Sequence, residues 1–224
     1  MKKTGMEITE LFDLSHTLAG DFLKKLVFPH EALPLIGEWI LQIGAGLDAA
    51  LYDHPEKDIW IAKSARVAPS ASITGPCIIG ENTEVRHCAY IRGNALVGNG
   101  AVVGNSTELK NVILLDNVQV PHYNYVGDSI LGYHAHMGAG AVTSNVKGDK
   151  TPVVLHGEDF SVETGRKKVG AMLGDYAEIG CGSVLNPGAV IGRHTSVYPL
   201  SSVRGVVPAD SIYKAKNNVV VRKK

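Results

Sequence analysis

Two cations at equivalent positions of a repeated pattern are the first residues in this sequence that could do chemistry. Arg92 and Lys110 are three hexads apart, and each directly follows an aliphatic residue that recurs along the chain. If three hexads form one coil, their side chains project side by side from neighbouring coils. Two adjacent cations repel each other unless an anion lies between them, and a phosphate group is the natural candidate. The alternative is that Glu84 or Glu108 neutralises them within the protein.

A histidine lies where this repeat loses its regularity. From Leu115 to Leu131 the pattern advances by two positions fewer than a full coil, and positions 121–128 read Pro-His-Tyr-Asn-Tyr-Val-Gly-Asp. A kink there would expose His122 one coil away from the two cations. Histidine titrates near neutral pH and is the usual general base. The spacing therefore indicates His122 as a candidate base, and the alternative is an ordinary histidine in a surface loop.

A solenoid must position these residues. Aliphatic residues recur every six positions from Ile61 to Leu115 and again from Leu173 to Val203, mostly with a small residue four positions later. This period fits neither a helix nor an alternating strand. It fits a coil with three short sides, in which aliphatic residues stack inside and small residues occupy the corners, and stacked coils pair in parallel.

The hexad pattern resembles that of the hexapeptide-repeat acyltransferases, and their left-handed turn is implied by this resemblance. We expect a mainly β protein built as a left-handed parallel β-helix, with an N-terminal helical segment and a hairpin insertion. The expected boundaries are 1–56 for the helical segment, 57–208 for the β-helix acyltransferase domain, 147–170 for the hairpin within it, and 209–224 for a C-terminal tail.

Composition limits the partners and the compartment. The 224 residues carry 22 Lys+Arg and 22 Asp+Glu, and this balance argues against a nucleic-acid partner. No apolar run approaches the roughly 18 residues of a membrane span, and the N-terminus lacks a signal-peptide pattern. Cys77, Cys88 and Cys181 lack the spacing of a zinc or redox site, so we expect reduced thiols, no bound metal and a cytoplasmic protein.

Longer motifs make the resemblance more specific. Residues 103–111, 121–128 and 137–140, followed by Asn145, resemble the acetyltransferase domain of the bifunctional glucosamine-1-phosphate N-acetyltransferase/UDP-N-acetylglucosamine pyrophosphorylases. The similarity extends over about 60–208, with spacing kept without gaps from Arg92 to Asn145. It implies acetyl-CoA as co-substrate, an amino-sugar phosphate such as glucosamine-1-phosphate as acceptor, a role in UDP-N-acetylglucosamine biosynthesis, and a homotrimer with active sites between its chains.

The resemblance also implies roles for individual residues. By match, His122 is the general base, and the backbone at Ala139 approaches the acetyl thioester. The remaining matched residues bind substrate: Arg92, Lys110 and Tyr125 hold the phosphate, and Asn145 contacts the sugar.

Three positions depart from the family pattern. His136 stands where the family has an asparagine that helps to hold the substrate amine. Cys181 lies near the position of the family serine that orients the base-side amine, and we expect Cys181 to contact the cofactor. Thr151 replaces a substrate-binding lysine. Residues 1–56 are too short and too helical for the nucleotidyltransferase half of the bifunctional enzymes, so we expect only the acetyl-transfer half.

Two other functions stay open. One is a γ-class carbonic anhydrase, whose zinc is held by three histidines across a trimer interface. His87 and His122 are nearly two coils apart and His134 and His136 follow, but Gly127 stands where that family has its further histidine. The other is a non-catalytic β-helix protein that binds a sugar phosphate.

Overall fold

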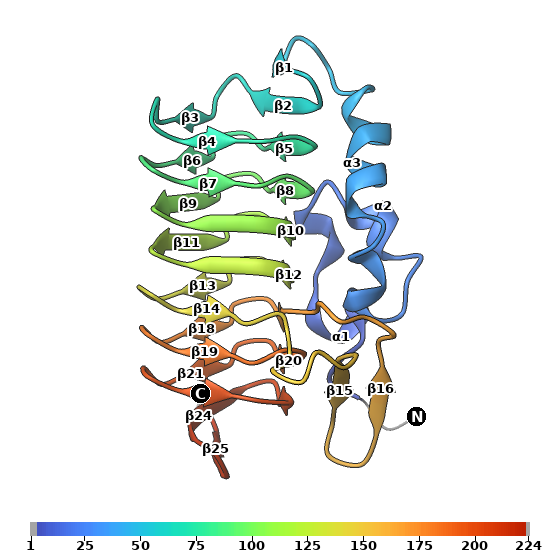
Figure 1. Ribbon diagram of the computed structural model, residues 1–224, viewed down its shortest axis with the longest axis vertical. Coiled ribbons are helices and arrows are strands. Elements are labelled where there is room, and N and C mark those ends of the chain that lie inside the picture. The colour runs from blue at the N-terminus through green and yellow to red at the C-terminus, as the bar shows by residue number, and fades with distance from the viewer. Residues whose placement is uncertain (1–3, 223–224) are drawn as a thin grey trace.

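The computed structural model describes residues 4–222 and shows a three-sided parallel β-helix whose coils stack along the long axis of the molecule (Figure 1). The predicted fold class, a mainly β left-handed parallel β-helix of hexapeptide repeats, is confirmed. Within residues 4–222 no helix has the length and apolar character needed to cross a membrane.

Each side of the β-helix is a column of short parallel strands. The first side contains β4 (Ser72–Ile73), β7 (Tyr90–Ile91), β14 (Val142–Thr143), β19 (Val184–Leu185) and β22 (Ser202–Val203). The second side contains β2 (Ile59–Ala62), β5 (Cys77–Ile79), β8 (Ala95–Val97), β17 (Ala171–Leu173), β20 (Ala189–Ile191) and β23 (Val206–Val207). The third side contains β3 (Arg66–Val67), β6 (Glu84–Val85), β9 (Val102–Asn105), β11 (Gln119–His122), β13 (His136–Met137), β18 (Glu178–Ile179), β21 (Ser196–Val197) and β24 (Ser211–Ala215).

Two longer strands turn the corner between the first and second sides. β10 (Glu108–Leu114) pairs with β7 through its first residues and with β8 through its last, and β12 (Tyr125–Leu131) runs beside β10 along its whole length. The strands thus carry residues 110–111 and 127–128 across this corner.

The inside of the helix is filled by stacked aliphatic residues, as the hexads predict. Ile79, Val97, Leu131, Leu173 and Ile191 are all fully buried. Burying one such side chain contributes about 1.5–3 kcal/mol relative to leaving it exposed. The repeated column therefore holds the coils together and fixes their register.

The register differs from the sequence-based prediction at one point. Leu114, rather than Leu115, aligns with Val97 on one side and with Leu131 on the other, in each direction one position short of three hexads. The shortfall of two positions is thus shared by two successive coils, because each loses one residue. Residues that face each other on β10, β12 and β14 are consequently one position short of three hexads apart in the sequence.

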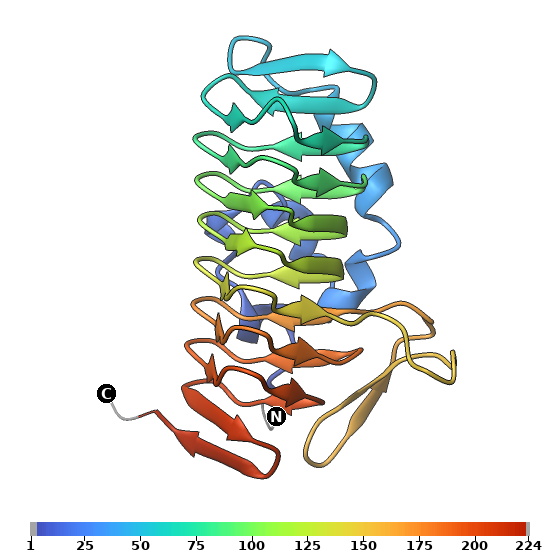
Figure 2. The ribbon, with the colours of Figure 1, turned by 60° about the vertical axis from the view of Figure 1, so that its left-hand side comes forward.

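The N-terminal segment covers the second side of the helix (Figures 1 and 2). It contains α1 (Ile8–Leu11), α2 (Gly20–Leu23), α3 (Ile36–Gly44) and the 3₁₀ turns η1 (Leu14–His16) and η2 (Pro29–Ala32). Ile36 and Ile40 of α3, four residues apart on one helix face, are fully buried, and α3 packs against β5, β8 and β10. Residues 52–56 lie in the span expected to be helical but form strand β1 (Tyr52–Glu56), antiparallel to β2.

Two antiparallel hairpins depart from the coil pattern. β15 (Val154–His156) and β16 (Ser161–Glu163) form one between β14 and β17 and project from the side of the helix (Figure 1). β24 and β25 (Asn218–Val221) form the other at the C-terminal end. Because β24 still pairs in parallel with β21, the coil continues past residue 208 into the span expected to be a tail.

Candidate functional site

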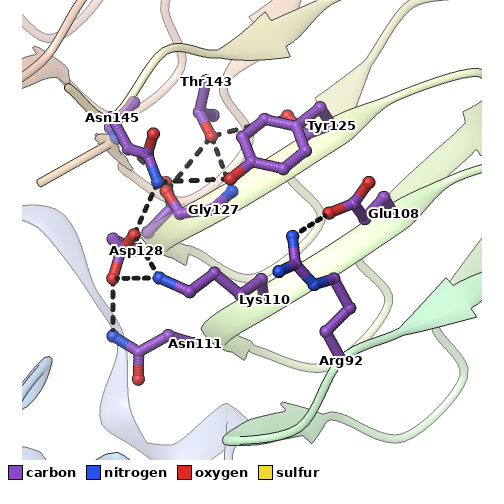
Figure 3. A network of polar contacts seen from close by, with 11 residues as sticks. Arg92, Glu108, Lys110, Asn111, Tyr125, Gly127, Asp128, Thr143 and Asn145 are labelled. Carbon is purple, nitrogen blue, oxygen red and sulfur yellow. Dashed lines mark hydrogen bonds and ion pairs between the residues drawn. The ribbon is translucent and has the colours of Figure 1, made fainter. Parts of the chain in front are cut away.

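A buried carboxylate at the corner between the first and second sides connects several of the predicted substrate residues (Figure 3). The Asp128 side chain is 3% exposed and lies 3.0 Å from Lys110 Nζ. It also accepts hydrogen bonds from Asn111 Nδ2 at 2.9 Å and from Asn145 Nδ2 at 2.6 Å. Asn111, Asp128 and Asn145 follow one another at the interval of a shortened coil, so the two shortened coils stack them in one column.

Tyr125 extends this network onto the first side. Its hydroxyl accepts a hydrogen bond from Asn145 Nδ2 at 3.2 Å. Partial burial raises the pKa of the Tyr125 hydroxyl, and the charges of Asp128 and Glu108 raise it further. The phenol therefore stays protonated at neutral pH and can donate a hydrogen bond to an anionic ligand. A Cβ at Gly127 would lie 2.4 Å from the tyrosine oxygen, so glycine there makes room for the ring.

Arg92 and Lys110 do lie on neighbouring coils, as their spacing predicts, because Ile91 and Leu109 before them are register partners. Each cation, however, has a carboxylate partner within the chain: Arg92 Nη1 lies 2.7 Å from Glu108 Oε1, and Lys110 contacts Asp128. Glu108 thus neutralises Arg92, as the alternative expected for both cations, whereas Lys110 is neutralised by Asp128, which was not expected. The Arg92–Glu108 pair is solvent-exposed and therefore weak, so a ligand phosphate can compete for this guanidinium.

His122 lies at the end of β11, on the third side, with an exposed side chain. Its backbone is held firmly: its N–H donates to Asn124 Oδ1 at 3.1 Å, and its carbonyl accepts from the Gly140 N–H at 3.0 Å. Buried Asn124 also donates to the carbonyls of Gly138 and Ala141. This one amide thus joins the irregular corner at 122–124 to the next coil and leaves the imidazole pointing outward.

Ala139 and Cys181 continue the column that starts at His122. The Ala139 carbonyl accepts a hydrogen bond from the Gly182 N–H at 2.8 Å, and the neighbouring Gly140 N–H contacts the His122 carbonyl. Within residues 4–222 the Ala139 N–H makes no hydrogen bond, and the residue is exposed. Cys181 is a free, exposed cysteine. His122, Ala139 and Cys181 therefore line one corner of the helix, with an unpaired backbone donor between the other two.

His136 lies apart from the other predicted substrate residues within one chain. It belongs to β13 on the third side, where its Nδ1 lies 2.8 Å from Glu178 Oε2. The Asp128 network lies at a different corner. A single chain thus gathers Lys110, Tyr125 and Asn145 and leaves His136 outside that group.

Sequence reasoning gave no role to Asp128 and Asn111, although both lie in motifs that resemble the acetyltransferase domain. The signal that could have found them is their equal spacing, since Asn111, Asp128 and Asn145 follow one another at one position short of three hexads. In the part of the chain that the structure describes, no group of three or more His, Cys, Asp or Glu side chains could hold a metal ion.

Comparisons with known proteins found a family profile and several curated relatives. The GMPPB C-terminal domain profile matches residues 73–166. The chain is 31% identical over 96% of its length to a protein named bifunctional protein GlmU from Methanococcus aeolicus, of which it spans 59%. It is 28% identical over 66% of its length to a bifunctional sugar-1-phosphate nucleotidylyltransferase/acetyltransferase from Sulfurisphaera tokodaii, of which it spans 41%.

The solved structures that match this chain include the acetyltransferase domain of PglB from Neisseria gonorrhoeae in complex with acetyl coenzyme A. That domain is 17% identical, the match covers 73% of this chain and 57% of that one, and the TM-score is 0.39.

Proposed function

We propose, from the premise that this chain resembles the acetyltransferase part of the bifunctional GlmU proteins, that it is an acetyl-CoA-dependent N-acetyltransferase acting on an amino-sugar phosphate such as glucosamine-1-phosphate. The proposal concerns acetyl transfer alone, because the chain spans about half the length of the GlmU relatives that match most of it. The observation that carries it is the placement of His122 and Tyr125, three residues apart, on the two sides of one corner.

On the first side, Arg92, Lys110 and Tyr125 are placed to hold the phosphate, with Asn145 toward the sugar. The Asp128 carboxylate holds the Lys110 ammonium and the Asn145 amide, and the protonated Tyr125 hydroxyl supplies a hydrogen-bond donor for the phosphate. Charge-assisted hydrogen bonds of this kind are the strong ones, so a phosphate is the group that these side chains suit best. Glu108 must release the Arg92 guanidinium when the phosphate binds.

On the corner between the first and third sides, His122 is proposed to accept the proton of the attacking amine, which must be neutral to act as a nucleophile. The amine nitrogen forms a bond to the thioester carbon, and the carbon–sulfur bond then breaks. The proton taken up by His122 passes to the leaving thiolate, so coenzyme A is released as a thiol. The unpaired Ala139 N–H is placed to stabilise the oxyanion of the intermediate, a contribution that preorganised donors make in other acyl transfers. Cys181 follows in the same column and is proposed to contact the cofactor.

The proposal includes a homotrimer with sites between its chains. α3 covers the second side of the helix, whereas the first and third sides carry the candidate residues and remain uncovered within residues 4–222 (Figure 2). In such an assembly His136 of one chain would approach the Asp128 network of another. This would reconcile its proposed contact with substrate and its distance from that network within one chain.

The direct test is an acceptor panel with a thiol readout. Purified protein is mixed with acetyl-CoA and, in turn, glucosamine-1-phosphate, other amino-sugar phosphates and matched sugar phosphates that lack the amine. Thiol release with the amino sugars alone supports the proposal. Release of no thiol with any amino-sugar phosphate, alongside intact binding of the sugar phosphate, would refute it.

That second result would favour the non-catalytic alternative, a sugar-phosphate-binding β-helix protein. The observation in its favour is His136, which replaces the asparagine expected to hold the acceptor amine and instead pairs with Glu178. A His136→Asn variant separates the cases, since it restores the family residue.

A further inference from the structure

A basic cleft lies beside the Asp128 network, on the side away from His122. Its volume is about 560 Å³. Three parts of the chain line it: Leu33 and Pro34 from the N-terminal segment, Asn94, Lys110, Asn111 and Asp128 from the coils, and Gly165, Arg166, Lys167 and Lys168 from the insertion. The cleft is thus built where the insertion and the N-terminal segment meet the corner of the helix.

The basic run of the insertion is fixed at this place by the backbone. Val169 N–H donates to the Asn145 carbonyl at 3.0 Å, and Gly170 N–H donates to the Asp128 carbonyl at 2.8 Å. Lys168 also forms an isolated antiparallel bridge with Val146. The basic run therefore adjoins Asp128, which holds Lys110, and Asn145, which donates to Asp128.

The charges lining the cleft are unbalanced. Within residues 4–222, Arg166, Lys167 and Lys168 make no ion pair, and Asp128 is the single acidic residue of the lining, already in contact with Lys110. The Arg166 Nε is buried and has no hydrogen-bond partner. The excess of positive charge over the single, already paired carboxylate favours an anionic ligand in the cleft.

We propose that this cleft binds the diphosphate group of a nucleotide ligand. A diphosphate carries more negative charge than one phosphate, and Arg166, Lys167 and Lys168 border the cleft, while Arg92 and Lys110 remain for the separate acceptor phosphate. The proposal deepens the proposed function, on which it rests for the identity of the ligand. The diphosphate belongs either to a nucleotide-linked amino sugar or to coenzyme A, and both present the same chemistry to these three cations.

The test measures binding without acetyl transfer. Titration calorimetry with UDP, with coenzyme A and with inorganic pyrophosphate is performed on the full chain and on a Lys167→Gln/Lys168→Gln variant. Arg166 is left unchanged because its partial burial makes it a risk for folding. A Lys24→Gln/Lys25→Gln variant serves as the matched control, since it removes two adjacent exposed lysines from the end of α2. Thermal unfolding checks that all variants fold.

We expect the wild-type chain to bind UDP or coenzyme A, the 167/168 variant to bind the same ligand at least tenfold more weakly, and the control to stay within twofold. Loss confined to UDP assigns the cleft to the acceptor, and loss confined to coenzyme A assigns it to the cofactor. Unchanged affinity in the 167/168 variant, or no binding of any of the three ligands to wild type, overturns the proposal.

Failure of this inference can be distinguished from failure of the proposed function. Thiol release with a simple amino-sugar phosphate, together with unchanged nucleotide affinity in the 167/168 variant, would refute the diphosphate site and support the acetyltransferase activity. Loss of nucleotide binding in the 167/168 variant, without any thiol release, would support the diphosphate site and refute the acetyltransferase activity.

Discussion

The Nζ of Lys110 lies 3.0 Å from Oδ2 of Asp128, one coil further along the helix. The carboxylate is buried, whereas the lysine side chain is 26% exposed. Asp128 therefore holds the lysine by its ammonium group while part of the side chain remains open to a ligand. The same carboxylate accepts hydrogen bonds from Asn111 and Asn145, so it is the shared support of this side of the site.

Replacement of this support should destabilise the protein. In Asp128→Asn the charge is lost, and an amide group would face the amide donors of Asn111 and Asn145. We expect the free energy of unfolding to fall by about 2–4 kcal/mol, because removing one member of a buried charged network leaves its partners unsatisfied. Urea unfolding measures the change. Glu108→Gln, which breaks the exposed pair with Arg92, is the control and should lower the free energy of unfolding much less than Asp128→Asn does. Equal losses in the two variants would contradict the assigned role of Asp128.

Replacement of His122 should affect turnover and not the fold. Its imidazole is exposed, and the hydrogen bonds that hold the residue come from its backbone, which alanine retains. We expect His122→Ala to reduce the acetyl-transfer rate by about 10²–10⁴-fold, the range of a general base. The free energy of unfolding should change by about 0.5 kcal/mol or less, as for other surface substitutions. Thiol release and urea unfolding are the two measurements, and unchanged turnover would remove His122 as the base.

Much of this architecture could be predicted from the sequence because the hexad is a local pattern. One aliphatic residue every six positions constrains each coil independently, so the fold class and the adjacency of Arg92 and Lys110 followed directly. The register near Leu115 was harder to predict, because both Leu114 and Leu115 are aliphatic and fully buried. Pairing across coils, which depends on the neighbouring strand on each side, selects Leu114.

The same limit explains what was missed at the site. In the sequence Asp128 resembles any other polar residue. In the structure the two shortened coils place Asn111 and Asn145 beside it. Glu108 could be named as a partner of Arg92 because its spacing falls within one regular coil. The insertion gave still less information, because no periodicity relates Arg166–Lys168 to Lys110, and backbone hydrogen bonds to Asp128 and Asn145 bring them together.

The three cysteines should differ sharply in reactivity. Complete burial raises the pKa of the Cys77 thiol from its ordinary value of 9.0 to about 12, whereas Cys88 and Cys181 are exposed. Because the thiolate is the reactive form, Cys77 should resist a thiol reagent at pH 8 in the native protein. We expect two thiols to react rapidly without urea and all three in urea. If acetyl-CoA binds at the proposed corner, it should slow the modification of Cys181 and leave that of Cys88 unchanged.

The raised pKa of Cys77 also predicts a loss of stability in alkali. Below about pH 9 the thiol is protonated in both the folded and the unfolded chain, so its full contribution to the free energy of unfolding is present. Between pH 9 and pH 12 the unfolded chain releases this proton and the folded chain retains it, and the free energy of unfolding falls by up to about 1.4 kcal/mol per pH unit. A Cys77→Val variant should show a shallower decline in urea titrations over this range. Identical slopes in the two proteins would contradict the prediction.

The coil that carries His122 should depend on a glycine in the coil before it. A Cβ at Gly104 would lie 1.6 Å from the carbonyl oxygen of Pro121, a backbone atom that cannot move without displacing β11. We expect Gly104→Ala to lower the free energy of unfolding by about 3 kcal/mol or more, at the upper end of overpacking effects.

Two further glycines separate this steric effect from the loss of a glycine as such. A Cβ at Gly148 or at Gly140 would meet no atom within 4 Å, but Gly140 has a φ of +69°. Gly148→Ala should therefore change stability by about 0.5 kcal/mol or less, and Gly140→Ala should cost about 1 kcal/mol through backbone strain alone. Urea unfolding of the three variants should give the order Gly104, Gly140, Gly148 in decreasing loss. A small effect at Gly104 would mean that β9 and β11 can separate at little cost, and the backbone at His122 would then not be held as rigidly as its hydrogen bonds indicate.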